Sequence, residues 1–169
     1  MKVQKILVPI DYSDHSHQAL QWGASLAETY GAQIVLLHVL HKAAEEVSRH
    51  VPTHEWVPYH YYTEVSSGIE PIRVERFIID LVDEARSRLY DLAAKDLQET
   101  VPVEVRVVVG KPADEILHLA QAEGADLIVM GTHGRTGLRH ALLGSVAEKV
   151  VRTASCPVFT VKAGTHLVP

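Results

Sequence analysis

Five short stretches of the chain consist almost entirely of apolar residues and are rich in valine and isoleucine. Their apolar residues run continuously instead of alternating with polar ones, which is typical of strands in a parallel sheet that helices cover on both faces. We therefore expect β-strands at Val3–Ile10, Gln33–Leu40, Val103–Val109, Asp126–Met130 and Pro157–Val161.

Four segments between these strands repeat apolar residues at helical spacing. The first is expected to run from Ser13, a good N-cap, to Tyr30, with Gly31 suited to the C-terminal cap. The second opens at Pro71, and the third opens at Pro112 and stops near Gly124. The last begins at Gly144-Ser145, and Ser145 with Glu148 matches a capping box. The residues expected on the apolar stripes are Leu20, Ala24, Ala27 and Tyr30; Ile78, Leu81, Val82, Ala85, Leu89, Leu92 and Leu97; Ile116, Leu117, Leu119 and Ala120; and Val146, Val150 and Val151.

Strand and helix alternate through the whole chain, and this order predicts an α/β fold. Right-handed crossovers turn it into a doubly wound, five-stranded parallel sheet with helices on both faces. A chain of 169 residues fits one domain, so we expect a single domain over 1–169 with an insertion at about 41–70. Ligands of such sheets lie outside the carboxyl ends of the strands, where the winding reverses. The relevant loops are Pro9–Ser13, the one from Val39 onward, and Gly131–Leu143.

A glycine-rich loop follows the strand that ends at Met130. Gly131 and Gly134 allow a sharp turn and a close approach of phosphate oxygens to the backbone. Gly144-Ser145 then places free N–H groups at a helix N-terminus, where the dipole favours an anion. Between Gly131 and Ser145 there are two arginines and two histidines and no acid, namely Arg135, Arg139, His133 and His140. Together these features predict a phosphate-binding loop, whereas the glycines alone would be compatible with an ordinary turn.

The bulk properties and the absent motifs exclude several classes of protein. A net charge of −5 disfavours a nucleic-acid binder, and the chain contains no apolar run of the roughly 20 residues needed to cross a membrane. The single cysteine, Cys156, fits a reducing compartment, so a cytoplasmic protein without membrane insertion is expected. Neither a Walker A loop nor a Gly-x-Gly-x-x-Gly fingerprint after the first strand is present.

Two further features remain open on the residues alone. Asp11 follows the first strand, where its carboxylate suits a ribose hydroxyl or an adenine amino group, and equally suits a turn or a helix cap. The segment 41–70 holds four histidines and four aromatic residues without zinc-type spacing, so we expect no metal site. It is read either as an aromatic flap beside the ligand or a partner, or as a solvated connection.

Several of these stretches, taken together, resemble the universal stress protein family. They are the opening Lys-Ile-Leu-Val-Pro-Ile-Asp-Tyr-Ser, the Leu-Leu-His-Val around His38, the Gly-Lys-Pro-Ala-Asp-Glu-Ile from Gly110, the glycine loop with its Gly-x₂-Gly-x₉-Gly-Ser spacing, and the closing Cys-Pro-Val-Phe-Thr-Val. The spacing of the loop resembles that of the ATP-binding branch of the family. The fold that this resemblance implies is Rossmann-like and similar to the adenine nucleotide α-hydrolases.

The resemblance also implies a ligand, an assembly and a set of contacts. The ligand would be ATP, with Mg²⁺ or Mn²⁺ held by phosphates and water, and the protein would be a stress-response homodimer paired through its last strand. Asp11 would contact the nucleoside, with Pro9 and Val39 beside the adenine. The ribose and phosphates would meet Met130, Gly131, Thr132, His133, Gly134, Arg135, Thr136 and Gly137, with Gly144, Ser145, Val146 and Ala147 closing over the phosphates.

The chemistry of the loop favours binding over catalysis. It supplies anion donors but no lysine of the Walker type and no carboxylate to hold magnesium, both of which phosphoryl transfer commonly uses. We therefore expect a module that binds or senses ATP and has a protein partner still to be identified. Two alternatives stay open, namely a slow ATP-hydrolysing or nucleotidyl-transferring enzyme with His133 as its base, and a nucleotide-free dimeric scaffold that acts through the insertion.

Overall fold

The computed structural model describes residues 2–41, 71–97, 101–134, 143–162 and 164. Strands and helices alternate in the order β1 (Lys5–Pro9), α1 (Asp14–Tyr30), β2 (Gln33–Leu40), α3 (Pro71–Asp96), β3 (Val103–Val109), α4 (Pro112–Ala122), β4 (Leu127–Gly131), α5 (Ser145–Thr153) and β5 (Val158–Val161). The expected segment 41–70 lies outside the described residues except for His41.

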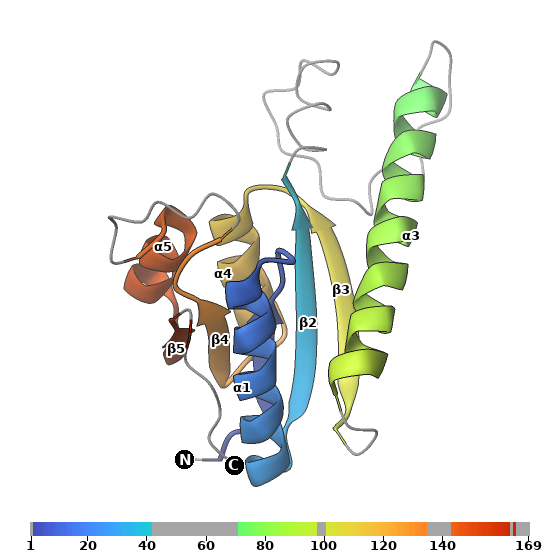
Figure 1. The fold of residues 1–169 in the computed structure, drawn as a ribbon. Helices are drawn as coiled ribbons and strands as arrows, with labels where there is room; N and C mark the ends of the chain where they lie inside the picture. Colours follow the sequence, from blue (N-terminus) through green and yellow to red (C-terminus); the bar gives the residue numbers. More distant parts are fainter. Residues whose placement is uncertain (1, 42–70, 98–100, 135–142, 163, 165–169) are drawn as a thin grey trace.

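The five strands form one parallel sheet in the order β3-β2-β1-β4-β5. The chain winds outward from β1 to β3 on one side and then returns to the other side of β1 with β4. The point at which the winding reverses therefore lies between β1 and β4, as the doubly wound fold predicts. The strand arrows point upward in Figure 1, so the loops that follow β1, β2 and β4 share the upper edge of the sheet.

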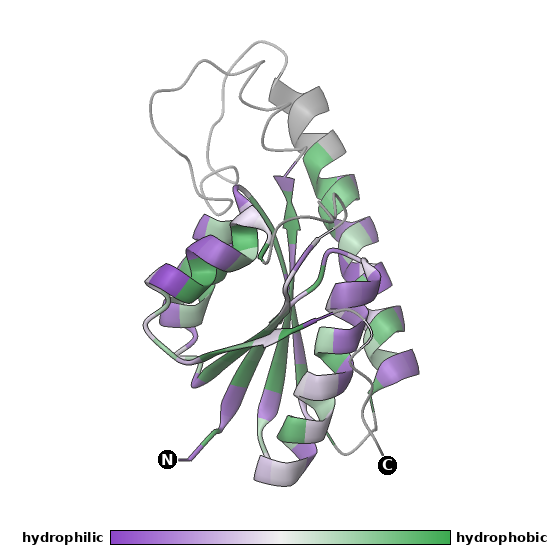
Figure 2. Cartoon of the chain, turned by 60° about the vertical axis from the view of Figure 1, so that its left-hand side comes forward, coloured by the Kyte–Doolittle hydropathy of each residue, from purple (hydrophilic) through white to green (hydrophobic). Residues whose placement is uncertain are grey.

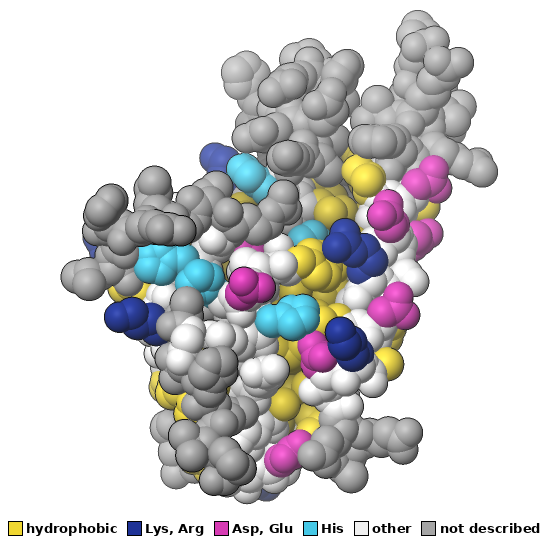
Figure 3. All heavy atoms as spheres, viewed as in Figure 1, with side chains coloured by type: hydrophobic (Ala, Val, Ile, Leu, Met, Phe, Trp, Pro, Cys, Tyr) yellow, Lys and Arg dark blue, Asp and Glu magenta, His cyan; other side chains and the backbone are white. Residues whose placement is uncertain are grey.

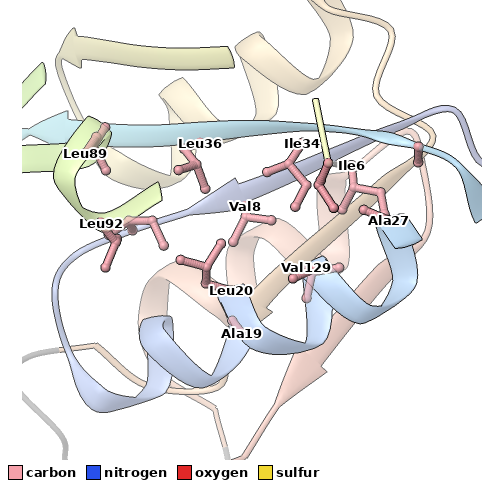
Figure 4. Packing of buried hydrophobic residues seen from close by; sticks show 14 of the residues in the cluster. Ile6, Val8, Ala19, Leu20, Ala27, Ile34, Leu36, Leu89, Leu92 and Val129 are labelled. Atoms are coloured by element: carbon pink, nitrogen blue, oxygen red, sulfur yellow. The ribbon is translucent and has the colours of Figure 1, made fainter. Parts of the chain in front are cut away.

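Two hydrophobic clusters cover the two faces of the sheet. One packs α1 and α3 against β1, β2 and β4, and Figure 4 shows Leu20 of α1 and Leu89 of α3 directed towards the sheet. The other packs α4 and α5 against the opposite face. Figure 2 shows hydrophobic strands in the centre and hydrophilic residues on the outer faces of the helices. The continuous apolar runs are thus explained by burial on both faces, as predicted.

The helix ends follow local sequence signals. Ser13 is the N-cap of α1 and its side chain accepts a hydrogen bond from the Ser16 backbone, while Gly31 adopts the left-handed C-cap conformation at φ 64°. Two expectations about the apolar stripes are wrong. Tyr30 is 52% exposed because it is the last residue of α1. Val151 is 44% exposed because successive helix residues point in different directions and its neighbour Val150, which is fully buried, takes the inward one.

Candidate functional site

The loop after β1 is held in place by its neighbours. The Ile10 N–H donates to the Leu37 carbonyl of β2 at 2.7 Å, and Nδ1 of His38 lies 2.7 Å from the Ile10 carbonyl oxygen. Oδ1 of Asp11 accepts hydrogen bonds from the Ser13 backbone at 3.0 Å and from the Ser13 hydroxyl at 2.5 Å. The turn-forming role of Asp11 considered from the sequence is therefore confirmed.

The other carboxylate oxygen of Asp11 faces the glycine loop. A Cβ atom placed on Gly134 would come within 2.7 Å of Oδ2 of Asp11, so the loops after β1 and β4 meet at this point. A carboxylate with one oxygen fixed by a turn has its second oxygen oriented by the same interaction. The turn thus orients this carboxylate toward the point where the two loops converge.

Close packing favours glycine at the described glycine positions of the loop, most strongly at Gly131. A Cβ on Gly131 would lie 2.7 Å from Cβ of His15 and 3.0 Å from its carbonyl carbon, and one on Gly144 would lie 3.3 Å from the Thr132 carbonyl oxygen. None of them has the left-handed backbone that requires glycine; among the described glycines, that backbone occurs elsewhere. The sharp turn expected at Gly131 is therefore replaced by a close approach of helix α1 to the end of β4.

Thr132 connects the glycine loop to the last strand and to α5. Its backbone N–H donates to the Val161 carbonyl at 2.9 Å, and its carbonyl accepts the Gly144 N–H at 2.7 Å. Its hydroxyl lies 3.1 Å from Nδ1 of His133, and the residue is 8% exposed. Two N–H groups of this loop, those of Thr132 and Gly144, are therefore used within the protein.

Helix α5 starts one residue earlier than a capping box with Ser145 as its N-cap would place it. Its N-cap is Gly144, with an extended backbone at φ −70° and ψ 156°, and Ser145 is its first helical residue. The capping box of Ser145 with Glu148 is thus wrong, because the Gly144 carbonyl already accepts the Glu148 N–H at 2.8 Å. The N–H groups of Ser145, Val146 and Ala147 precede that first bond, so the helix itself offers them no acceptor.

Pro9 and Val39, which are predicted to lie beside the adenine, and Met130, which is predicted to begin the ribose and phosphate contacts, lie on three strands of the sheet. Pro9 ends β1 and pairs with Leu37, two residues before Val39 on the neighbouring strand. Val39 and the buried Met130 both pack with the hydrophobic cluster under α4 and α5. The predicted nucleotide contacts of Pro9, Val39 and Met130 remain predictions. Arg135, Thr136 and Gly137 lie outside the described residues, as do Arg139 and His140.

The structure adds His15 to the residues that meet at this edge. Its ring centroid lies 5.6 Å from that of His133, and its backbone packs on Gly131. The sequence offered one usable signal, because His15 lies in the first turn of a helix that begins at the carboxyl edge of the sheet. Figure 3 shows acidic, basic and histidine side chains interspersed on the face that Figure 1 presents.

Other groups constrain the chemistry of the molecule. Within the described ranges, no cluster of three or more His, Cys, Asp or Glu side chains is arranged to hold a metal ion. Burial raises the pKa of the Cys156 thiol, which disfavours the reactive thiolate. Among the helices that the structure describes, none has both the length and the apolar character needed to cross a membrane.

Comparison with protein families matches residues 2–162 to the model described as the universal stress protein family. The chain is 33% identical over 160 residues to universal stress protein MJ0531 of Methanocaldococcus jannaschii, which covers 94% of this chain and 82% of the relative. It is 33% identical over 158 residues to universal stress protein YxiE of Bacillus subtilis, with 94% and 98% of the two chains covered.

Solved structures with the same fold agree with this match. The structure of the protein MJ0577 has a TM-score of 0.74 at 28% identity and covers 98% of this chain and 100% of its own. A universal stress protein in complex with cAMP has a TM-score of 0.59 at 23% identity, covering 96% and 98% of the two chains. One from Archaeoglobus fulgidus in complex with dAMP has a TM-score of 0.51 at 21% identity, covering 95% and 98%.

Proposed function

The chain belongs to the universal stress protein family, and from that premise we propose that it is a stress-response regulator that binds ATP at the edge where the loops after β1, β2 and β4 meet. The nucleotide acts as the signal that the protein senses. A divalent cation accompanying the ATP, Mg²⁺ or Mn²⁺, is held by the phosphates and by water.

The convergence of Asp11 and Gly134 carries this proposal. A side chain at Gly134 would come within 2.7 Å of the Asp11 carboxylate, so glycine allows the loop after β4 to lie against that group. The carboxylate accepts from a hydroxyl or an amino group, which are the donors of adenosine. Pro9 and Val39 supply apolar surface for the base at the same edge, and Met130 begins the segment that contacts the ribose and phosphates.

The start of α5 supports the phosphate end of the proposed site. The N–H groups of Ser145, Val146 and Ala147 have no acceptor within the helix, and the helix dipole adds positive potential there. Gly144 lets the backbone come close to Thr132, with which it shares a hydrogen bond. His133 and the loop residues Arg135, Thr136 and Gly137 complete the proposed set of contacts to ribose and phosphates.

We also propose that the protein works as a homodimer in the cytoplasm, with β5 as the pairing strand. In the described sheet β5 stands at one end of the strand order and pairs only with β4. An edge strand presents unpaired backbone groups to a second chain, and Phe159 on this strand is 39% exposed.

The test is to denature the purified protein and identify the released nucleotide by mass spectrometry, then to titrate ATP calorimetrically. Replacing Gly134 and Gly144 by Asp should abolish retention, because side-chain atoms and negative charge enter the phosphate region. Gln121→Asp, which adds one negative charge at an exposed position of α4, should retain ATP and is the control for each single Gly→Asp variant. Equal retention in the folded double variant would refute the site. Turnover of ATP that His133→Ala removes would instead support the hydrolysing alternative.

A further inference from the structure

Tyr12, next to the proposed ligand-binding Asp11, has an unusual backbone. Its φ is 63°, and among the residues that the structure describes no other non-glycine residue has a positive φ. This left-handed conformation brings Cβ close to the following carbonyl oxygen, so it costs free energy for an aromatic residue. Such a conformation persists where surrounding contacts impose it.

Three contacts from two elements, α3 and β2, hold the side chain of Tyr12. The guanidinium carbon of Arg88 on α3 lies 4.3 Å from the ring centroid, within the range of a cation–π interaction. The ring of His38 on β2 lies 4.8 Å from it, tilted by 50°. The Tyr12 hydroxyl lies 3.4 Å from the Ala85 carbonyl oxygen of α3. Burial raises the pKa of Tyr12, an effect that Arg88 partly offsets, so the ring stays neutral at physiological pH.

These contacts act on the residue in the middle of a turn. Oδ1 of Asp11 accepts the Ser13 N–H across Tyr12, so the φ and ψ angles of Tyr12 determine whether that hydrogen bond closes. His38 also holds the preceding residue, through its contact with the Ile10 carbonyl. The stack thus holds both sides of Asp11 from β2 and α3.

We propose that Tyr12 is a positioning residue, and that the stack of Arg88, Tyr12 and His38 aims the Asp11 carboxylate at the adenosine of the nucleotide. This inference rests on the proposed function, since it assigns the determinant of nucleoside recognition in that same site. It also makes α3 a part of the binding apparatus, through the contacts of Arg88 and Ala85 with Tyr12.

Substitutions at Tyr12 separate positioning from packing. Tyr12→Phe keeps the stack and should retain most of the affinity. Tyr12→Ala loses the stack but keeps the penalty of positive φ, so the turn should open and the affinity for adenosine and for ATP should fall by the same factor, about tenfold. Tyr12→Gly should bind better than Tyr12→Ala, because glycine accepts the left-handed conformation. A purely packing role predicts the reverse order, since glycine fills less space.

Two further experiments test whether the effect of Tyr12 depends on Arg88 and on Asp11. Arg88→Gln should weaken adenosine binding about threefold, because it removes the cation above the ring. Arg86→Gln is the matched control, since Arg86 lies on the same helix and pairs with Asp83 on the exposed surface, 3.0 Å away. In the Asp11→Asn background, Tyr12→Ala should have no further effect on affinity. Additive losses in that background would overturn the proposal.

Hydrogen exchange of the Ser13 amide tests the positioning without any nucleotide. Its protection should fall in Tyr12→Ala and recover in Tyr12→Gly, and unchanged protection in Tyr12→Ala would overturn the proposal. If the wild-type protein binds neither adenosine nor ATP, the proposed function fails. In that case the protection of the Ser13 amide alone shows whether the contacts of Tyr12 with Arg88 and His38 hold the turn.

Discussion

Replacing Gly131 by alanine tests how closely α1 approaches the end of β4. The new Cβ would lie 2.7 Å from Cβ of His15, whereas carbon atoms in contact are normally about 3.5–4.0 Å apart. The first turn of α1 would have to withdraw by about 1 Å. That helix carries Ala19 and Leu20, both fully buried, so the shift reaches the core.

Overpacking of this kind costs about 1–3 kcal/mol of unfolding free energy. For a chain of this length, a loss of about 2 kcal/mol lowers Tm by roughly 4–8 °C. The assay is urea unfolding followed by far-UV circular dichroism, in which the midpoint should fall while the slope with denaturant stays constant.

A double-mutant cycle with His15→Gly assigns the loss to this contact. Removing Cβ of His15 should recover part of the loss, and only part, because the carbonyl carbon and oxygen of His15 would still lie 3.0 Å and 3.1 Å from the new methyl group. Strictly additive effects, or a Gly131→Ala variant as stable as the wild type, would refute the packing of α1 on β4 described above.

Three other variants test the charges and the ligand edge. Glu123→Gln should cost about 1 kcal/mol at pH 7, because Glu123 loses its ion pairs with Lys5 at 2.9 Å and Arg106 at 2.9 Å. These partners lower the pKa of Glu123 below its ordinary value of 4.5, so the difference in stability should persist above pH 4.5 and disappear as the pH falls through the lower folded value. Burial raises the pKa of Glu115 instead, so the wild type loses stability as the pH rises above 4.5; Glu115→Gln should therefore gain relative stability from pH 4 to pH 7 in thermal melts, and a constant difference would contradict the sign. Gly134→Ala should lower the affinity for ATP about tenfold in calorimetric titrations, with little change in Tm because the residue is exposed; wild-type affinity would contradict the close approach.

The architecture could be predicted from the sequence because its signals are local and repeated. All five strands and four helices lie where the apolar periodicity places them, with ends shifted by at most two residues. The shift at β1 has a nonlocal cause, because the backbone N–H groups of Gln4 and Lys5 donate to the Asp126 carboxylate, 2.8 Å and 3.0 Å away. The strand ladder therefore starts later than the apolar run.

The details of the candidate site could not be predicted in the same way. Gly144 and Ser145 are both good N-caps, and the hydrogen bond from Gly144 to the Thr132 carbonyl decides between them. Nothing in the sequence around Tyr12 indicates positive φ, because Arg88 and His38 impose it from distant parts of the chain. His15 likewise reaches the site only through the packing of α1 on β4.

The hydrogen bond from Thr132 to the Val161 carbonyl links the glycine loop to the last strand. In the same register Gly131 pairs with Val161, so the loop begins where β5 ends. A protomer paired along β5 would alter the backbone that anchors this loop, and a ligand held by the loop would alter the strand in return. Because thermodynamic coupling is reciprocal, a nucleotide that tightens self-association must itself be bound more tightly by the dimer. Protein concentration would then set the apparent ligand affinity of the molecule.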